Sequence, residues 1–166
     1  MSAGMEQIRQ TVADYLIGQG VAAVTAWPMA IRKEEGPVVV VSLRGCQAEC
    51  SGFQDYLGER FNEQTGLWEE RYGKKAKITF GLDIYAPEKG DGQAVQQVFD
   101  QLAGALILGE PEGLRVEEFS CGQTEYDGES RRLKRPVQAV CPAYLSAAAQ
   151  TGGEFVDFEL RGVVKP

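Results

Sequence analysis

The sequence predicts an α+β fold, a mostly antiparallel sheet with two helices packed on one face and a protruding β-hairpin arm. Two segments have the 3.6-residue apolar period of amphipathic helices. The strand-like segments mostly follow one another without a helix between them, so the regular alternation that builds a doubly wound parallel sheet is missing. A length of 166 residues, with 43% hydrophobic and 25% charged residues, fits one globular domain over residues 1–166.

The two helices are expected at residues 4–18 and 93–108. Gly18 or Gly20 ends the first helix. Asp91 is the predicted N-cap of the second, and Gly109 and Pro111 stop it. The second helix carries an apolar stripe that should lie on a sheet: Val95, Val98, Phe99, Leu102 and Leu106.

Two strands are predicted between the N-terminal helix and the arm. Residues 21–27 form a short apolar segment that Pro28 breaks. Residues 37–43 are a continuous apolar run, which is typical of a strand covered on both faces, and Arg44-Gly45 is expected to close it.

The arm is expected at residues 53–72. Two aromatic-bearing segments flank residues 62–66, which contain Asn and Gly, and this favours a hairpin. A helix through residues 53–61 is the alternative, because the apolar spacing there is also helical. Residues 73–75 predict a bend or bulge before an alternating strand over 76–85, with Ile78 to Ile84 facing the core and Lys77 to Asp83 on a wet or interfacial face.

The second half of the chain reads as further strands. We expect one over residues 114–124, a hairpin turn at Asp127-Gly128, and a returning strand over 132–145 in which Pro136 and Pro142 indicate an edge or a bulge. Residues 146–153 are small and read as a flexible joint. Residues 146–166 would then be a C-terminal extension strand that pairs with its own sheet or, alternatively, with a neighbour's.

The composition excludes several classes of chemistry. Histidine is absent, which removes Ser-His-Asp and Cys-His triads and His-ligated metals, whereas catalysis by paired carboxylates stays open. The four cysteines have no zinc-site spacing and read as free thiols, so no metal and no cofactor is expected. A net charge of −7 argues against tight nucleic-acid binding. The sequence contains neither a membrane-length apolar run nor a signal-peptide pattern, so we expect a cytoplasmic protein.

Two groups of side chains are candidates for contacts with other proteins. Large aromatic side chains on a protruding arm mark an interaction surface, unless the arm folds back and buries them. The basic cluster either contacts phosphate or an acidic partner, or is a solvated hairpin arm. The candidates are Phe61, Trp68, Tyr72, Phe155, Phe158 and Leu160 for a subunit interface, and Arg131, Arg132, Lys134 and Arg135 for polar contacts.

Over residues 5–145 the chain resembles the tail terminator, or tail-completion, proteins of long-tailed bacteriophages, the family of the phage lambda terminator, and it is similar to sequences of prophage tail regions. The resemblance is carried by the N-terminal helix, the strand at 37–45, the arm closing at 62–68, the strand at 76–87, the second helix and the turn at 126–128. The arm is longer than is usual in the family, and residues 146–166 extend past its usual end.

The resemblance implies a structural protein without enzymatic activity. Such a subunit forms a homo-oligomeric ring, hexameric in the family, that caps the tail tube, stops its polymerisation and offers a surface to the head. The implied partners are further copies of the chain, the major tail-tube protein and a head-completion or connector protein, with DNA passing through unbound and no membrane involved. Assembly would take place in the host cytoplasm and end in the virion tail. Other tail, neck or baseplate proteins, and a small ligand-binding or enzymatic domain with a closed pocket, are the alternatives.

Overall fold

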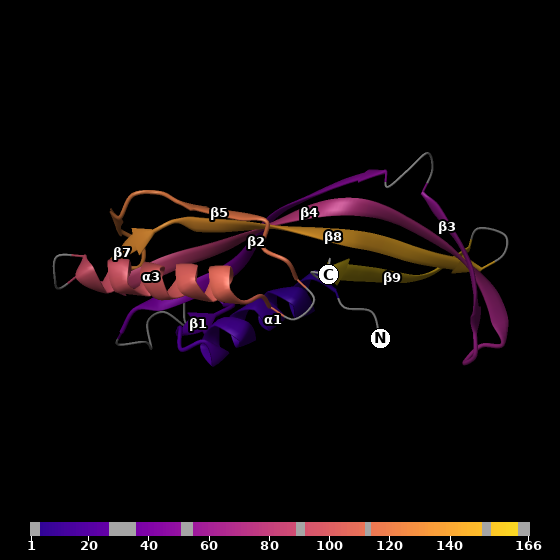
Figure 1. Ribbon diagram of the computed structural model, residues 1–166, viewed down its shortest axis with the longest axis horizontal. Coiled ribbons are helices and arrows are strands. Elements are labelled where there is room, and N and C mark those ends of the chain that lie inside the picture. The colour runs from indigo at the N-terminus through magenta and orange to yellow at the C-terminus, as the bar shows by residue number, and fades with distance from the viewer. Residues whose placement is uncertain are drawn as a thin grey trace.

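The computed structural model describes residues 4–26, 36–50, 55–88, 92–111, 114–150 and 154–162, the last segment and Gln150 by their backbone. In this described part of the chain one sheet contains nine strands, and two helices lie side by side against one end of it (Figure 1). Every described strand pair is antiparallel except β1–β2. The predicted α+β class is therefore confirmed.

The long strand β4 organises the sheet. The elements in chain order are α1 (Met5–Gly18), β1 (Ala23–Val24), β2 (Val38–Cys50), β3 (Tyr56–Asn62), β4 (Leu67–Pro87), α3 (Gln93–Leu108), β5 (Glu118–Cys121), β6 (Glu125–Asp127), β7 (Arg132–Arg135), β8 (Val137–Gln150) and β9 (Glu154–Gly162). One side of β4 pairs with β3 and then β2, and its other side pairs with β8 and then β7. Beyond β8 lie β9 and β5, and beyond β7 lies β6.

The core lies between the two helices and one face of β4. The apolar stripe of α3 is confirmed, because it packs with α1 against alternate residues of β4. The run at the start of β2 is covered on both faces as predicted: Val39 and Val41 join this core, whereas Val38 and Val40 join Tyr85 in a second cluster. Burial of this apolar area, at roughly 25 cal/mol per Å², is the main contribution that stabilises the helix-covered end.

α3 has the predicted bounds and α1 begins one residue later than predicted, but the N-cap of α3 differs. Gly92 occupies the cap position with φ +82°, a left-handed conformation that glycine adopts at little steric cost. Asp91 lies outside the described residues, as do Trp27 and Pro28.

The predicted end of β2 at Arg44-Gly45 is wrong, because the strand continues to Cys50. The register shifts between Leu43 and Gly45, so Arg44 is the extra residue of a bulge, after which pairing with β4 resumes. A glycine next to a charged residue marks the bulge here and not the end of the strand.

The arm is a hairpin of β3 and the start of β4, as predicted, and the helical alternative is wrong. The bend or bulge expected at residues 73–75 is absent, since β4 runs unbroken through them. Gly73 has a packing role instead: a Cβ there would lie 2.6 Å from Cδ1 of Leu57, at the irregularity of β3. The missing side chain makes room for Leu57.

The flexible joint predicted at residues 146–153 is wrong for Ser146 to Gln150, which form the end of β8. They pair with β4 on one side and β9 on the other, and Ala148 and Ala149 are buried. Residues 151–153 and 163–166 lie outside the described residues. β9 pairs with its own sheet, which was the first of the two expectations.

The remaining strands are more broken than predicted. The strand expected at 114–124 is confined to β5, and Pro136 divides the returning strand into β7 and β8. Pro142 stays inside β8, at the point where the outer neighbour of β8 changes from β5 to β9. The turn at Asp127-Gly128 joins β6 to β7 as predicted.

The four thiols differ in accessibility, and this makes the fold testable. Cys46, Cys50 and Cys121 are exposed, whereas Cys141 is buried and burial raises its pKa to about 12. We expect the dilute native chain to react with three equivalents of a water-soluble thiol reagent at pH 8, because Cys141 is neither accessible nor ionised. Mass spectrometry after labelling reads this out. Modification of Cys141 without denaturant would contradict the core described above.

Candidate subunit interface

The sheet is much longer than the helices that cover it. β4 has 21 residues and α3 has 16. At ~3.3 Å per strand residue and ~1.5 Å per helix residue, the strand extends over about 70 Å and the helix over about 24 Å. The part of the sheet formed by β3, β8, β9 and the start of β4 therefore extends beyond both helices (Figure 1).

Four aromatic residues lie on this bare extension. Trp68 and Tyr72 are separated from Ile78 by even numbers of residues along β4, so they lie on the face that the helices cover further along. The register pairs Phe61 with Trp68 and Tyr56 with Tyr72, and both pairs have edge-to-face rings with centroids 5.6 Å apart. We call Tyr56, Phe61, Trp68 and Tyr72 the aromatic face.

The aromatic face is open to solvent. The exposed fractions are 49% for Phe61, 56% for Trp68 and 37% for Tyr72. The arm therefore does not fold back to bury its rings, which was the alternative considered from the sequence. Contiguous exposed aromatic groups on a monomer are typical of a protein–protein contact.

The register brings the C-terminal candidates into the same region. Ala147 of β8 pairs with Tyr72 on one side and with Phe158 on the other, so one row crosses all four strands of the extension. Leu160 pairs with Leu145 in the next row on the same side, and Phe155 pairs with Ala149 beyond an irregularity of β9. Residues about 90 positions apart in sequence thus lie in one row of the sheet.

The opposite face of the arm carries a polar cluster beside exposed Leu57 and Leu67, and none of the four aromatic rings. Glu69 is buried, with a 2% exposed fraction, and accepts hydrogen bonds from Asn62 Nδ2 at 2.7 Å and Arg60 Nε at 3.2 Å. These contacts join β3 to β4 next to the turn. The two faces of the arm therefore differ in chemistry, and the aromatic rings are confined to one of them.

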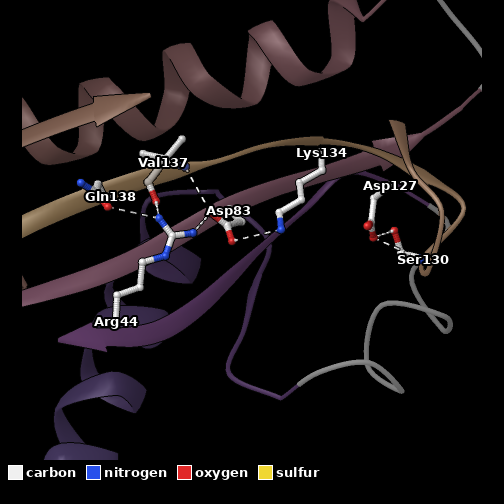
Figure 2. Close-up of polar contacts among 7 residues, drawn as sticks. All are labelled: Arg44, Asp83, Asp127, Ser130, Lys134, Val137 and Gln138. Carbon is white, nitrogen blue, oxygen red and sulfur yellow. Dashed lines mark hydrogen bonds and ion pairs between the residues drawn. The ribbon is translucent and has the colours of Figure 1, made fainter. Parts of the chain in front are cut away.

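A polar network connects neighbouring strands at the helix-covered end of the sheet (Figure 2). Asp83 on β4 receives the Arg44 guanidinium at Oδ1, and the same oxygen accepts the backbone N–H of Val137 at 3.2 Å. Lys134 Nζ lies 3.9 Å from Oδ2. Arg44 also donates to the Val137 carbonyl at 3.5 Å and to Gln138 Oε1 at 3.4 Å. One arginine thus spans β2, β4 and β8, and Asp83 is buried where a wet face was expected.

Three of the basic candidates have contacts inside the described chain. Lys134 lies 5.6 Å from the Tyr85 ring centroid, and burial with the nearby Asp83 raises the pKa of Tyr85, so its hydroxyl is neutral. Arg132 donates to the Gly36 carbonyl at 3.0 Å, and Arg135 donates to Thr124 and Gln96 and lies over the Phe99 ring.

Arg131 is the exposed member of the basic cluster. It has φ +55° in the turn between β6 and β7. Asp127 accepts hydrogen bonds from Ser130 in this turn, and they lower the pKa of the Asp127 carboxyl (Figure 2).

A groove of about 440 Å³ lies beside Pro142. It is open, and charged side chains line much of it, including Glu49, Lys75, Lys77 and Arg115. The described residues contain no group of three potential metal ligands. Among the helices described, none has the length and apolar character that crossing a membrane requires.

A comparison with solved structures finds a similar fold. The chain is similar to the sheath/tube terminator of an extracellular contractile injection system, PVC, in its extended state, with a TM-score of 0.52 and 14% identity. The chain shares its fold with this terminator. The match covers 100% of this chain and 65% of that one, so this chain spans about two thirds of its length.

The sequence comparisons add nothing to this structural likeness. No family model matches the chain, and no curated protein matches it. The likeness in fold therefore stands on the structure.

Sequence reasoning found three of the four residues of the aromatic face and missed Tyr56. The signal for Tyr56 was available, because once a hairpin turn at 62–66 is assumed, counting back along the strand brings Tyr56 close to Tyr72. The Asp83 network was also missed. Its partners are separated from Asp83 by 39 and 54 positions in sequence, beyond the reach of local patterns.

Proposed function

We propose that this chain is a structural subunit of a phage-type tail, which forms a ring at the end of the tail tube, stops its polymerisation and joins the tail to the head. The observation that carries the proposal is the fold shared with a sheath/tube terminator over the whole of this chain. The bare aromatic face supports it, since an assembly subunit needs a surface that its partner covers. Further copies, a tail-tube or sheath protein and a head-side protein are the partners, and six copies make the ring.

The aromatic face and the C-terminal strand β9 contribute the subunit contacts in this proposal. Ring closure requires two different patches that recognise each other, because a self-complementary patch gives only a dimer. Exposed Arg131 is the member of the basic cluster best placed to meet an acidic surface on the tube or head side. The chain is neither an enzyme nor a cofactor carrier in this role, and DNA passes through the ring without specific contacts.

The test is the state of assembly as a function of concentration. We expect light scattering and electron microscopy to show a closed ring at high concentration. Trp68→Ser should raise the concentration at the midpoint of assembly at least about 30-fold, because a central aromatic side chain typically contributes ≥2 kcal/mol to an interface. Tyr126→Ser is the matched control, since Tyr126 is equally exposed (54% against 56%) but lies on β6, away from the arm. A chain that stays monomeric at every concentration, alone and with a tail-tube protein, contradicts the proposal.

A further inference from the structure

The two long edges of the sheet are open in the described part of the chain. β2 pairs with β4 along its length, but on its other side β1 reaches only Val39 and Val40, so residues 42–50 face no strand there. β9 pairs with β8 alone, and its outer edge is open over Glu154–Gly162. An open edge presents unpaired backbone N–H and C=O groups, which can pair with a strand of another chain.

The open edge of β2 carries a bulge and an inward-directed arginine at Arg44, which protect its start, but the later part of the edge has fewer such features. Residues 42–50 contain no proline and no lysine. Residues 42–50 contain two charged residues, Arg44 and Glu49. Arg44 is directed across the sheet to Asp83, so Glu49 is the one that remains at the edge. Residues 44–50 are all exposed, and this open stretch is longer than β1, β5 or β6.

The strand directions fit a head-to-tail contact between copies. β2 and β8 both run antiparallel to β4, and β9 runs antiparallel to β8. β9 therefore runs antiparallel to β2. A rotation about an axis along the strands places β9 of one copy beside β2 of the next in antiparallel orientation, without inverting either copy. Because this contact joins two different edges, it can repeat until a ring closes.

β9 is acidic, and basic side chains lie near the open edge of β2. Residues 42–50 hold one basic and one acidic residue, Arg44 and Glu49, and Arg44 is paired with Asp83. Three lysines lie beside them on β4, Lys74, Lys75 and Lys77, of which Lys74 is paired with Asp55. β9 holds three acidic residues and one basic residue, net −2, and β8 holds none. Pairing β2 with β9 brings the acidic residues of β9 near these lysines, whereas β9–β9 pairing brings like charges together.

We propose that residues 42–50 of one copy pair antiparallel with β9 of the next copy, so that one continuous sheet runs around the ring. The inference rests on the proposed function, because it assigns the contact that closes the ring. It adds a specific backbone interface to the aromatic face, with a second copy of this chain as the partner.

Native cysteines make this contact testable. Cys46 and Cys50 lie on the open edge of β2, and within one chain β4 and β8 separate β2 from β9. Three interstrand steps of ~4.8 Å keep the two strands about 14 Å apart in one chain, whereas a disulfide needs Cα atoms within about 7 Å. A disulfide between β2 and β9 can therefore form only between copies.

The experiment uses the full chain with Cys121→Ser and a single cysteine placed in turn at each of the nine positions of β9. Under mild oxidation at a concentration that supports rings, we expect a ladder of covalent oligomers for the positions that face Cys46 or Cys50. The control is Glu125→Cys in the same background, on the short edge strand β6, and it should give no ladder.

The outcomes separate this inference from the proposed function. Rings that form without a disulfide at any β9 position overturn the edge pairing and leave the proposed function standing. Covalent dimers formed without any β9 cysteine show β2–β2 pairing and overturn the head-to-tail contact. A chain that forms no ring overturns both.

A pair of proline variants gives a second readout. Successive N–H groups of a strand point to opposite sides. Proline has no N–H, so one of the two variants Gln47→Pro and Ala48→Pro removes a hydrogen bond to β4, and the other removes an N–H that points outward from the sheet edge. We expect one variant to lower Tm. The other should keep the Tm of the monomer and raise the midpoint concentration of assembly at least about tenfold, since it removes a bond of the proposed interface. Normal assembly of this well-folded variant contradicts the inference.

Discussion

Asp83→Ala is expected to lower the free energy of unfolding by about 2–3 kcal/mol, a loss of roughly 5–10 °C in Tm for a chain of this length. The side chain of Asp83 has an exposed fraction of 12%, and its Oδ1 accepts from both Arg44 and the Val137 N–H. Its removal leaves a buried N–H and a partly buried guanidinium without their acceptor, which costs more than the pair contributes when intact. Urea unfolding at a concentration at which the chain is monomeric measures the difference.

Asp83→Asn separates charge from shape. The amide oxygen can still accept a hydrogen bond from the Val137 N–H. We therefore expect Asp83→Asn to lower the free energy of unfolding by about half as much as Asp83→Ala does. Glu118→Ala is the control, since it removes one negative charge from an exposed position of β5 and should stay within about 0.5 kcal/mol of the parent chain. An Asp83→Ala chain as stable as this control would show that the network does not hold β2, β4 and β8 together.

The elements that the sequence predicts well are those with a local pattern. Both helices were predicted within a residue of their bounds, because their apolar stripes repeat every 3.6 residues and glycine ends the first. The arm was recognisable from the Asn and Gly of its turn. These signals depend only on residues close together in the chain.

The errors fall where pairing over long sequence separation decides the structure. Ser146 to Gln150 have small side chains and no pattern, yet they form a strand because β4 and β9 pair with them on both sides. β2 likewise continues past Arg44-Gly45 because β4 extends far enough to pair with it. The strand state of these residues is imposed by their neighbours in the sheet and not by their own propensity.

The candidate interface was only partly predictable for the same reason. Large aromatics on an arm indicated a surface, but that the rings are exposed follows from the length of β4 relative to the helices, which is a property of the assembled sheet. Of the open edges, the C-terminal strand was anticipated as one that could pair with a neighbour's sheet, whereas most of the open part of β2 was not, because β2 was expected to end at Arg44-Gly45.

Gly81→Ala is the second large effect, with an expected cost of about 1–3 kcal/mol. A Cβ at Gly81 would lie 2.7 Å from Nε and 3.0 Å from Cζ of Arg44, and it would also meet Oγ of Ser42. The hydroxyl of Ser42 can rotate, but the guanidinium is held by its acceptors on β4 and β8. The alanine methyl therefore displaces Arg44 from Asp83, and this loss outweighs the ~0.4–1 kcal/mol that Gly→Ala gains by restricting the unfolded chain.

A double-mutant cycle with Arg44→Ala tests that reason. If the cost comes from displacing the guanidinium, Gly81→Ala should cost at least about 1 kcal/mol less in the Arg44→Ala background than in the parent. Gly45→Ala is the control, because nothing lies within 4 Å of a Cβ at that position, and it should be close to neutral. Equal costs of Gly81→Ala in both backgrounds would assign the effect to Ser42 or to the strand backbone. In that case, the missing side chain at Gly81 would not be the reason why Arg44 can reach from the bulge of β2 across β4 to β8.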